Sequence, residues 1–218
     1  YLVVSNDDGT TRIHLSEIES ITICTTQAFM SSYLMAELAK NKIRVVFCDE
    51  KWNPVSEAIP LHGHFRVSGC IAQQLEWSMP CRKHVWMHVV QDKICAQADV
   101  LEREGYDPQS KVLRGYIKEV HSGDTTNREA AAACLYFSTL FGKDFNRDVD
   151  CWMNASLNYG YDVLMSKCAR EIVARGYLTE VGIFHRGEMN PWNLACDLME
   201  PFRPVVDELV IHSGQFDF

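Results

Sequence analysis

The sequence predicts an α+β protein with a small N-terminal β-rich domain and a larger all-helical C-terminal domain. Short aliphatic and β-branched runs separated by turn residues fill residues 1–60, as expected for strands. From about residue 65 onward such runs nearly vanish, and apolar residues recur at the spacing of amphipathic helices. The change falls at Pro60–His64, so we expect domains at residues 1–62 and 63–218.

The N-terminal region contains a predicted β-hairpin and a predicted crossover unit. Leu2–Val4 and Arg12–Leu15 flank Asn6–Gly9, whose Asn-Asp-Asp-Gly sequence is typical of a hairpin turn. Strands are also expected at Ile18–Cys24 and Ile43–Cys48, with a helix between them. A strand, a helix and a second strand in this order are typical of a crossover unit.

The helix of this crossover unit is expected to begin after Thr25 and Thr26, whose hydroxyl groups can cap its first turn. Phe29, Tyr33 and Leu38 follow it at helical spacing. This pattern indicates an amphipathic helix that starts close to Thr25 and precedes the strand Ile43–Cys48.

The larger domain is predicted to consist of helices. Pro80 ends the first of them, and Gly160 in the last long helix is expected to permit close packing against a neighbouring helix. Gly176 ends that long helix. The expected helices are Val67–Trp77, Arg82–Arg103 and residues 108–120, 126–142 and 154–175.

Composition narrows the functional classes. The net charge of −8 argues against coating of nucleic acid over the whole surface, but it leaves room for a local basic surface. No apolar run approaches the ~20 residues that cross a bilayer, so no membrane partner is expected. The nine cysteines are scattered singly, which favours reduced thiols in a cytoplasmic protein over a disulfide frame or a zinc knuckle.

A stretch near the C-terminus carries the first signal for chemistry. His185 leads into a loop, and the following helix carries Asp197 and Glu200 at a spacing that places both carboxylates on one helix face. Imidazole and carboxylate ligands from two segments suit Mn²⁺ or Mg²⁺ better than Zn²⁺. Two acidic residues before a proline are also common at ordinary helix ends, so this stretch alone leaves both interpretations open.

Further candidate ligands lie elsewhere in the chain. Glu129 stands at the start of an Ala-rich helix and is the best candidate for a third ligand, although an acidic residue in a first turn also complements the helix dipole. His84 and His88 have a spacing that can bind zinc. Val85 stands where the zinc-protease motif has its glutamate, which favours surface or packing roles for this pair.

A series of motifs follows one order along the chain: Ile13–Glu19, Val45–Asp49, Asn127–Ala130, Leu140–Gly142, Leu157–Tyr161, His185 and Asp197–Pro204. Their order and spacing closely resemble the CRISPR-associated integrase family Cas1, in the style of its type II branch. The resemblance covers nearly the whole chain. Members of this family usually extend beyond both ends of the matching region, so we expect further strand sequence before Tyr1 and further helix after Phe218.

The resemblance implies a metal-dependent DNA endonuclease and integrase that acts by phosphodiester transesterification. Members of the family dimerise, and two dimers flank a central Cas2 dimer in a heterohexamer. The complex captures double-stranded prespacer DNA and joins its 3′-OH ends into the leader-proximal repeat of the CRISPR array. The expected partners are these two DNAs, a second copy of the chain, Cas2 and other type II adaptation proteins, in the prokaryotic cytoplasm.

The resemblance also assigns residues by position. Glu129, His185 and Glu200 match the metal ligands of the family's catalytic site, and Asp197 matches an acidic neighbour that supports it. The implied cofactor is Mg²⁺ or Mn²⁺, which can activate a 3′-hydroxyl and neutralise charge on the phosphodiester. The candidate DNA contacts are Arg128, Asn158, Tyr159, Arg186 and Arg203, with structural ion pairing an equally good interpretation of each arginine.

Two other functions remain open from the sequence. One is a catalytically silent scaffold that only positions DNA or a partner protein, and the intact ligand set speaks against it. The other is a hydrolytic nuclease on branched DNA. The same site would serve integration and hydrolysis, since only the nucleophile differs, so the sequence does not separate them.

Overall fold

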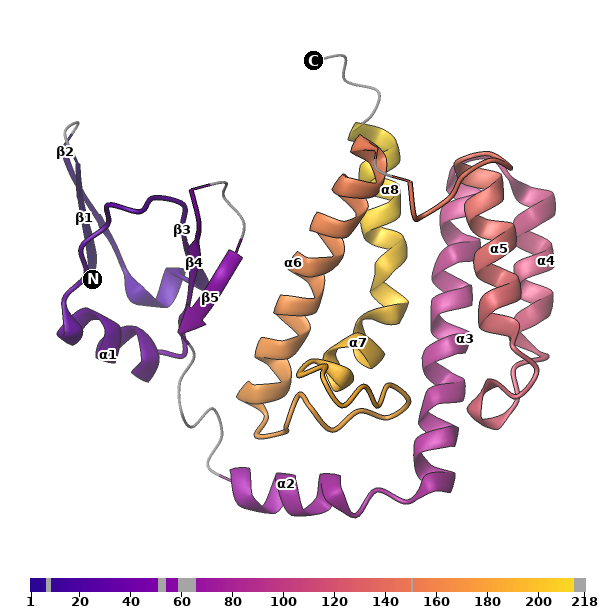
Figure 1. The fold of residues 1–218 in the computed structure, drawn as a ribbon, viewed down its shortest axis with the longest axis horizontal. Coiled ribbons are helices and arrows are strands. Elements are labelled where there is room, and N and C mark those ends of the chain that lie inside the picture. Colours follow the sequence, from indigo (N-terminus) through magenta and orange to yellow (C-terminus); the bar gives the residue numbers. More distant parts are fainter. Residues whose placement is uncertain (7–8, 51–53, 59–65, 150, 214–218) are drawn as a thin grey trace. The chain divides into compact units, whose positions relative to one another are not determined.

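The computed structural model describes residues 1–6, 9–50, 54–58, 66–149 and 151–213 (Figure 1). The chain divides into two compact units. The N-terminal unit comprises Tyr1–Val67 with Val173–Gly176, and the helical unit comprises Ser68–Ile172 with Tyr177–Phe218. Strands in the first and helices in the second confirm the predicted α+β class. The boundary predicted between residues 62 and 63 lies outside the described residues.

The N-terminal unit begins with the predicted hairpin. β1 (Leu2–Asn6) pairs antiparallel with β2 (Gly9–Ile13), so that Leu2 lies opposite Ile13. The Asn6 side chain accepts a hydrogen bond from the Gly9 N–H at 3.1 Å, as expected where such a residue enters a tight turn. Residues 7 and 8 of the predicted turn lie outside the described residues.

A short 3₁₀ helix, η1 (Leu15–Glu17), leads into a second sheet. β3 (Ser20–Ile23) pairs parallel with β4 (Arg44–Cys48), and β4 pairs antiparallel with β5 (Pro54–Ala58). The helix α1 (Ser32–Lys40) connects the two parallel strands, as the crossover pattern predicts.

The start predicted for α1 is wrong. The helix begins at Ser32 because the Ser31 side chain, and not Thr25 or Thr26, accepts the hydrogen bond of a first-turn N–H, at 3.1 Å. The Thr25 hydroxyl instead accepts from the Gln27 N–H at 3.2 Å, which closes a local turn. Sequence spacing alone does not decide between two such caps.

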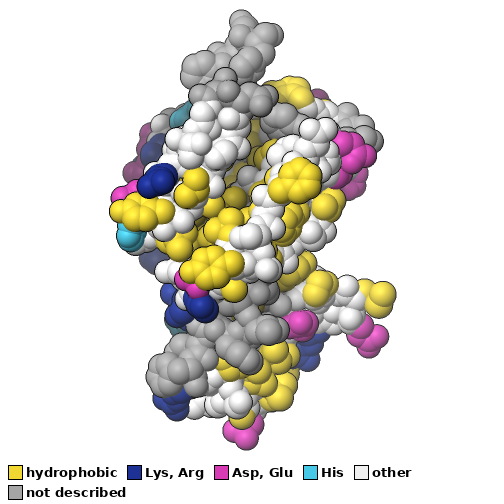
Figure 2. Space-filling view, turned by 90° about the vertical axis from the view of Figure 1, so that its left-hand side faces the viewer, with side chains coloured by type: hydrophobic (Ala, Val, Ile, Leu, Met, Phe, Trp, Pro, Cys, Tyr) yellow, Lys and Arg dark blue, Asp and Glu magenta, His cyan; other side chains and the backbone are white. Residues whose placement is uncertain are grey.

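The core of the N-terminal unit is built on Leu38 of α1 and on Ile43 and Val45 at the start of β4, all of which are buried. Phe29 and Tyr33, which share the apolar pattern with Leu38, are 100% and 75% exposed. Figure 2 shows several large hydrophobic side chains exposed in the same way on one face of the molecule, among charged groups of both signs.

The helical unit is built around one long helix. That helix, α3, packs against α4, α5, α7 and α8. A Ser78 side-chain cap and Pro80 in the first turn define its start, and Gly105 at φ +82° follows its end. The helices are α2 (Val67–Leu75), α3 (Met79–Arg103), α4 (Asp107–Ile117), η2 (Ser122–Asp124), α5 (Arg128–Leu140), α6 (Trp152–Ala174), α7 (Asn193–Met199), η3 (Glu200–Phe202) and α8 (Arg203–Ser213).

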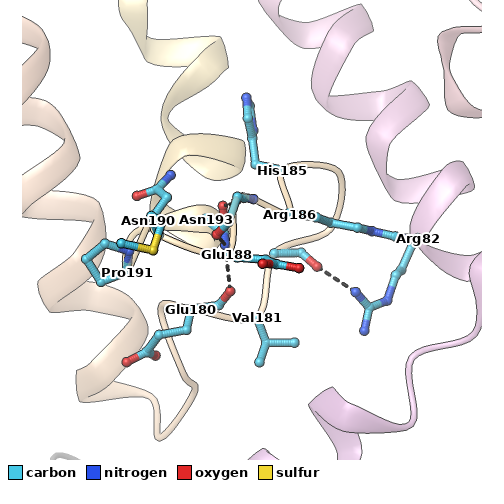
Figure 3. A pocket seen from close by; sticks show the side chains of 12 residues that line it. Arg82, Glu180, Val181, His185, Arg186, Glu188, Asn190, Pro191 and Asn193 are labelled. Atoms are coloured by element: carbon cyan, nitrogen blue, oxygen red, sulfur yellow. Dashed lines mark hydrogen bonds between the residues drawn. The ribbon is translucent and has the colours of Figure 1, made fainter.

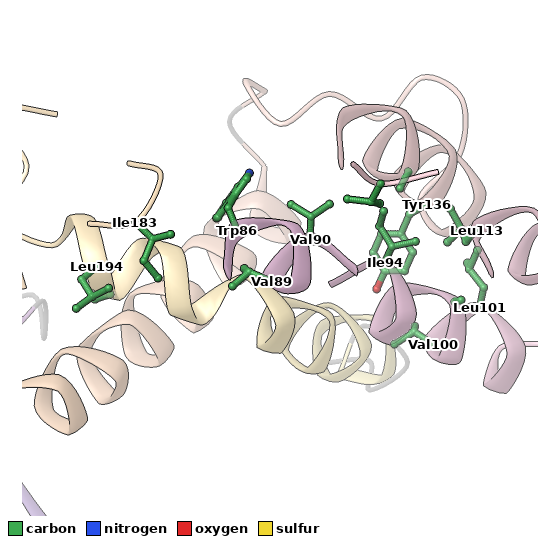
Figure 4. Packing of buried hydrophobic residues seen from close by; sticks show 14 of the residues in the cluster. Trp86, Val89, Val90, Ile94, Val100, Leu101, Leu113, Tyr136, Ile183 and Leu194 are labelled. Carbon is green, nitrogen blue, oxygen red and sulfur yellow. The ribbon is translucent and has the colours of Figure 1, made fainter. Parts of the chain in front are cut away.

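One face of α3 forms the main core (Figure 4). Trp86, Val90, Ile94 and Leu101 recur at helical spacing, and each is at most 1% exposed. Tyr136 of α5 is fully buried in the same cluster. This packing fixes α3 as the rigid element from which side chains can be directed toward the loops around it.

A second core cluster joins α6 to α8 and α7. Leu157 and Tyr161 of α6 pack with Met199 and Val210. A Cβ built on Gly160 would lie 2.3 Å from the Val206 Cγ1 of α8, so the two helices approach more closely than alanine would allow. The predicted packing role of the glycine is thus confirmed. Within the described residues, no helix is both long and apolar enough to span a bilayer.

Candidate active site

The loop between α6 and α7 carries His185 and is held by polar side chains from three helices. Gln74 of α2 is fully buried, donates to two loop carbonyls at 2.8 and 2.9 Å, and accepts a loop N–H at 2.8 Å. Asn193 of α7 donates to two more loop carbonyls at 3.0 Å each. Arg82 of α3 donates to the Gly182 carbonyl at 2.7 Å. These contacts satisfy backbone groups of an irregular segment that has no ladder of its own.

Asp197 of α7 is fully buried and holds the middle of this loop, around His185. Its carboxylate accepts hydrogen bonds from the backbone N–H groups of Ile183 at 2.5 Å, Phe184 at 3.0 Å and His185 at 3.0 Å. The Nδ1 of His185 lies 2.7 Å from the same carboxylate. All of its nearby partners belong to the loop, so Asp197 orients His185 and does not itself face the other carboxylates.

Asp197 holds one ring nitrogen of His185 and leaves the other free. Because Nδ1–H donates to Asp197, the lone pair of the neutral imidazole is on Nε2. The hydrogen bond that His185 donates to Asp197 raises the pKa of His185 above its ordinary value, burial opposes the rise, and the charges of Asp197, Glu200 and Glu129 add to it.

Aromatic packing fixes the side of the loop from which His185 projects. Trp86 of α3 stacks on Phe184 with ring centroids 4.3 Å apart and meets the His185 ring edge-on at 5.9 Å. Trp86 belongs to the main core and is 1% exposed, so the imidazole packs against a rigid part of α3.

Glu129 and Glu200 come from distant parts of the chain and meet at one lysine. Glu129 is in the first turn of α5, and Glu200 opens η3 and is 4% exposed. The Lys93 Nζ of α3 lies 2.7 Å from Glu129 Oε1 and 2.5 Å from Glu200 Oε2. The two carboxylates therefore share one cationic neighbour.

The start of α5 positions Glu129 through an acid that the sequence analysis did not single out. Asp124 accepts hydrogen bonds from the N–H groups of Arg128 at 2.9 Å and Glu129 at 3.0 Å. Asn127 precedes the helix at φ +53° and makes no side-chain cap. Asp124 thus caps the helix from three residues further back and fixes the backbone that carries Glu129.

The donor set of this site fits Mg²⁺ or Mn²⁺: two carboxylates and an imidazole Nε2, supported by Asp197. Among the residues that the structure describes, no group of three His, Cys, Asp or Glu side chains is arranged to hold a metal ion. The Lys93 ammonium is the cation between Glu129 and Glu200 in this arrangement. Metal binding at these carboxylates therefore requires the lysine to move.

Arg203, a candidate DNA contact, is occupied within the protein. Its Nε lies 2.9 Å from Glu200 Oε1, and its guanidinium lies over the Tyr161 ring at 4.6 Å. The Tyr161 hydroxyl in turn donates to the buried Asp207. Arg203 therefore holds the second carboxylate oxygen of Glu200.

The other candidate DNA contacts differ in how far they are occupied. Arg128 pairs with the exposed Glu119 at 3.0 Å. The exposed Asn158 side chain accepts a hydrogen bond from Arg147 at 2.6 Å. Tyr159 is 65% exposed on α6. Asn158 and Tyr159 are therefore exposed, whereas Arg128 is half-buried and its guanidinium lies over the Tyr116 ring at 5.3 Å.

A surface pocket of about 590 Å³ opens beside His185 (Figure 3). Its walls come from the His185 loop and from Arg82 of α3, and Arg186 and Glu188 line it as well. The Arg186 side chain is exposed and contacts the Met79 sulfur at 2.8 Å. Two arginines, Arg82 and Arg186, and two glutamates, Glu180 and Glu188, line this pocket, so it offers groups of both charges beside the imidazole.

The paired histidines of α3 do not take part in this site. His84 and His88 are exposed, and their Nε2 atoms lie 3.3 Å apart, so the two rings contact each other. Neither contacts a residue of the candidate site in any interaction that the structure describes. This placement agrees with the surface role expected for the two histidines, because Val85 stands where the zinc-protease motif has a glutamate.

Comparison with known proteins identifies the chain. The family model described as CRISPR associated protein Cas1 matches residues 1–215. The chain belongs to the Cas1 family. The resemblance inferred from the ordered motifs is therefore confirmed.

Two Cas1 relatives show how far the likeness extends. The chain is 39% identical over 211 residues to the CRISPR-associated endonuclease Cas1 of Neisseria meningitidis serogroup C, which covers 97% of this chain and 69% of that protein. It is 32% identical over 229 residues to a CRISPR-associated endonuclease Cas1 of Pyrobaculum aerophilum, covering 96% and 75%. Both relatives bear the name of endonuclease.

Solved structures share the fold. A Cas1 protein from Thermotoga maritima superposes with a TM-score of 0.77 at 18% identity, covering 99% of this chain and 74% of that one. A casposase bound to an integration product gives 0.71 at 24% identity, covering 92% and 62%. A partial Cas6-RT-Cas1–Cas2 complex gives 0.69 at 21% identity, covering 99% and 72%. At these identities the comparisons establish the fold alone.

Proposed function

We propose that this Cas1 chain is a metal-dependent DNA integrase of CRISPR adaptation that joins 3′-OH ends of prespacer DNA to the CRISPR repeat by transesterification. The observation that carries the proposal is the meeting of Glu129 and Glu200 at Lys93, together with a histidine, His185, whose Nδ1 is held by Asp197. The Cas1 relatives are named endonucleases, and a casposase of the same fold was solved bound to an integration product, which supports the proposal.

The side chains have separate roles in this function. Glu129, Glu200 and His185 Nε2 would hold Mg²⁺ or Mn²⁺, and Asp197 keeps His185 in the tautomer that leaves Nε2 free. A bound divalent cation supplies charge neutralisation at the phosphodiester and activation of the attacking 3′-hydroxyl. Arg82 and Arg186 border the pocket next to His185, where phosphate oxygens of the DNA would bind.

The partners follow from the family and from the solved complexes. A structural relative is a complex that contains Cas1 and Cas2, so we propose Cas2, a second copy of this chain and the two DNAs as partners. The net charge of −8 means that DNA binding depends on local basic surfaces. We place this assembly in the prokaryotic cytoplasm, where the CRISPR array is.

Strand joining by site variants tests the proposal. A short labelled duplex is incubated with a repeat-bearing plasmid, Cas2 and Mn²⁺, and the labelled joined product is quantified. Glu129→Gln, His185→Ala and Glu200→Gln should abolish joining while the circular-dichroism spectrum stays that of the wild type. The matched control is Glu76→Gln, because Glu76 is an exposed glutamate outside the site. Joining at the wild-type rate in Glu200→Gln would exclude this site as the catalytic centre.

A hydrolytic nuclease is a second candidate, favoured by the name endonuclease that the relatives carry. A parallel reaction with a labelled branched DNA in place of the duplex separates the two functions, because hydrolysis shortens the branched DNA whereas integration transfers the label of the duplex to the plasmid. A scaffold would give neither product. If the branched DNA is shortened and no labelled plasmid forms, the protein is a hydrolytic nuclease and the proposal of integration is wrong.

A further inference from the structure

Lys93 is a charged residue on the core-facing side of α3. It follows Val90 by three positions and precedes Gln97 by four, on the stripe that packs into the helical unit. Its side chain is 12% exposed. Lysine is rarely buried to this extent unless its ammonium is paired. The ammonium here is paired twice, with carboxylates from two separate elements.

The two carboxylates need a cation between them. Glu200 is 4% exposed, so an unpaired charge there would carry a large desolvation cost. Like charges that converge at one point also repel each other. Arg203 neutralises the other oxygen of Glu200, at 2.9 Å, whereas Lys93 is the cation that touches both Glu200 and Glu129 in the described part of the chain.

Lys93 and a metal ion compete for the same oxygens. A hard divalent cation bound by Glu129 and Glu200 needs their lone pairs at about 2.1 Å, and an ammonium 2.7 and 2.5 Å from those oxygens repels it. The flexible four-carbon stem of lysine allows its ammonium to move away. The Arg203 guanidinium is less free to move, because it lies over the Tyr161 ring at 4.6 Å.

We propose that Lys93 is the internal counter-ion of the metal-free site: it holds Glu129 and Glu200 together until a divalent cation displaces it, and it thereby lowers the metal affinity. The metal half of this inference rests on the proposed function. Lys93 is thus a positioning residue that acts through the two carboxylates. A purely structural lysine would affect stability but would not weaken metal binding.

Calorimetric titration with MnCl₂ tests the competition. Lys93→Met keeps the length of the side chain and removes its charge, so the Mn²⁺ affinity should rise about tenfold, which corresponds to about 1.4 kcal/mol. The metal-free melting temperature of Lys93→Met should fall, because two carboxylates then face each other without a cation. The matched control is Lys83→Met, since Lys83 is an exposed lysine of the same helix, and it should change neither quantity.

A double variant protects the test against a failure to fold. In Lys93→Met with Glu129→Gln, one of the two carboxylates is neutral and Glu200 keeps Arg203, so the metal-free melting temperature should return toward that of the wild type. A double variant that is no more stable than Lys93→Met overturns the counter-ion role. This arm needs no metal and decides the matter even if Lys93→Met does not fold.

The results separate this inference from the proposed function. If the wild-type protein binds no Mn²⁺, the proposed metal site is wrong. The metal-free melting temperatures then still test whether Lys93 is the counter-ion of the two carboxylates. Wild-type protein that binds Mn²⁺ with the same affinity as Lys93→Met, or more tightly, leaves the metal site standing and overturns the competition.

Discussion

Replacement of Asp207 by asparagine should change the pH dependence of stability. Asp207 of α8 is 1% exposed and accepts a hydrogen bond from the Tyr161 hydroxyl. Burial raises the pKa of Asp207 from 3.8 to about 6, against the opposing effects of the hydrogen bonds from Tyr161 and Tyr136 and of the positive charges of Arg203 and Arg147. The folded protein therefore keeps a proton on Asp207 at pH values where the unfolded chain has lost it.

The sign and size of the effect follow from this difference. Between about pH 4 and pH 6 the folded state binds more protons than the unfolded state, so stability falls as the pH rises through this window and then levels off. A rise from 3.8 to about 6, at 1.36 kcal/mol for each pH unit, corresponds to about 3 kcal/mol. Asparagine does not titrate and keeps an oxygen for Tyr161, so the variant lacks this loss.

Urea unfolding at pH 4 and at pH 7.5 measures the effect. The unfolding free energy of Asp207→Asn relative to the wild type should be more favourable at pH 7.5 than at pH 4 by about 2.4 kcal/mol, because at pH 4 part of the full effect is already lost. Asp162→Asn on the exposed face of α6 is the control and should show the same difference from the wild type at both pH values. A pH-independent difference for Asp207→Asn, or one of opposite sign, would show that Arg203 and Arg147 stabilise a charged Asp207.

Three further predictions concern the site and its support. Asp197→Asn replaces one of the two accepting oxygens of Asp197 by an NH₂ donor, so at least one backbone N–H of the loop loses its acceptor. Urea unfolding should show a loss of about 3 kcal/mol, and the Mn²⁺ affinity should fall ~10–100-fold; wild-type values of both would contradict the role of Asp197 in orienting His185. Gly160→Ala should lower the free energy of unfolding by about 1–3 kcal/mol despite the better helix propensity of alanine, because its Cβ would meet Val206. Adding Val206→Ala to the same chain should restore part of the loss. A Gly160→Ala protein that is more stable than the wild type would disprove the close approach of α6 and α8. Affinity for duplex DNA, measured by fluorescence anisotropy, should fall steeply with salt, by a log–log slope of about 0.9 for each phosphate contact, whereas a flat response would favour the scaffold.

The sequence predicted the class of fold because periodicity is local information. The alternation and helical spacing along residues 1–60 and after residue 65 reflect which side of each element is buried. The start of α1 was not predictable in this way. Ser31 and Thr25 are both good caps by residue type, and the choice depends on where Leu38 must lie to reach the core with Val45.

The roles of the acidic residues depended on tertiary structure in the same way. A spacing of three placed Asp197 and Glu200 on one helix face, but Asp197 is directed to the N–H groups of the His185 loop, while Glu200 is directed to Lys93 and Arg203. Helix spacing contains no information about an irregular loop that needs an acceptor. From the sequence, only the resemblance to the Cas1 family distinguished Asp197, as a supporting acid, from Glu200, as an expected metal ligand.

Lys93 was the residue that the sequence could have revealed. It stands on the α3 stripe that also contains Val90, Ile94 and Gln97, where a charged residue contradicts the apolar pattern. A lysine at a core-facing position requires a carboxylate partner nearby, and Glu129 and Glu200 were already candidates. The interruption of an apolar stripe by a charge is therefore a signal for a polar site next to that helix.

The contacts around Glu200 explain how the proposed site for a divalent cation can keep its carboxylates together without a metal ion. Glu200 has Lys93 on one oxygen and Arg203 on the other, and the Arg203 guanidinium is in turn held by Tyr161. The two cations differ in mobility, since a lysine ammonium can move away on its flexible stem and a stacked guanidinium cannot do so without losing its ring contact. Because only one of the two has to leave, Glu200 keeps its orientation while its other oxygen becomes available to a metal ion.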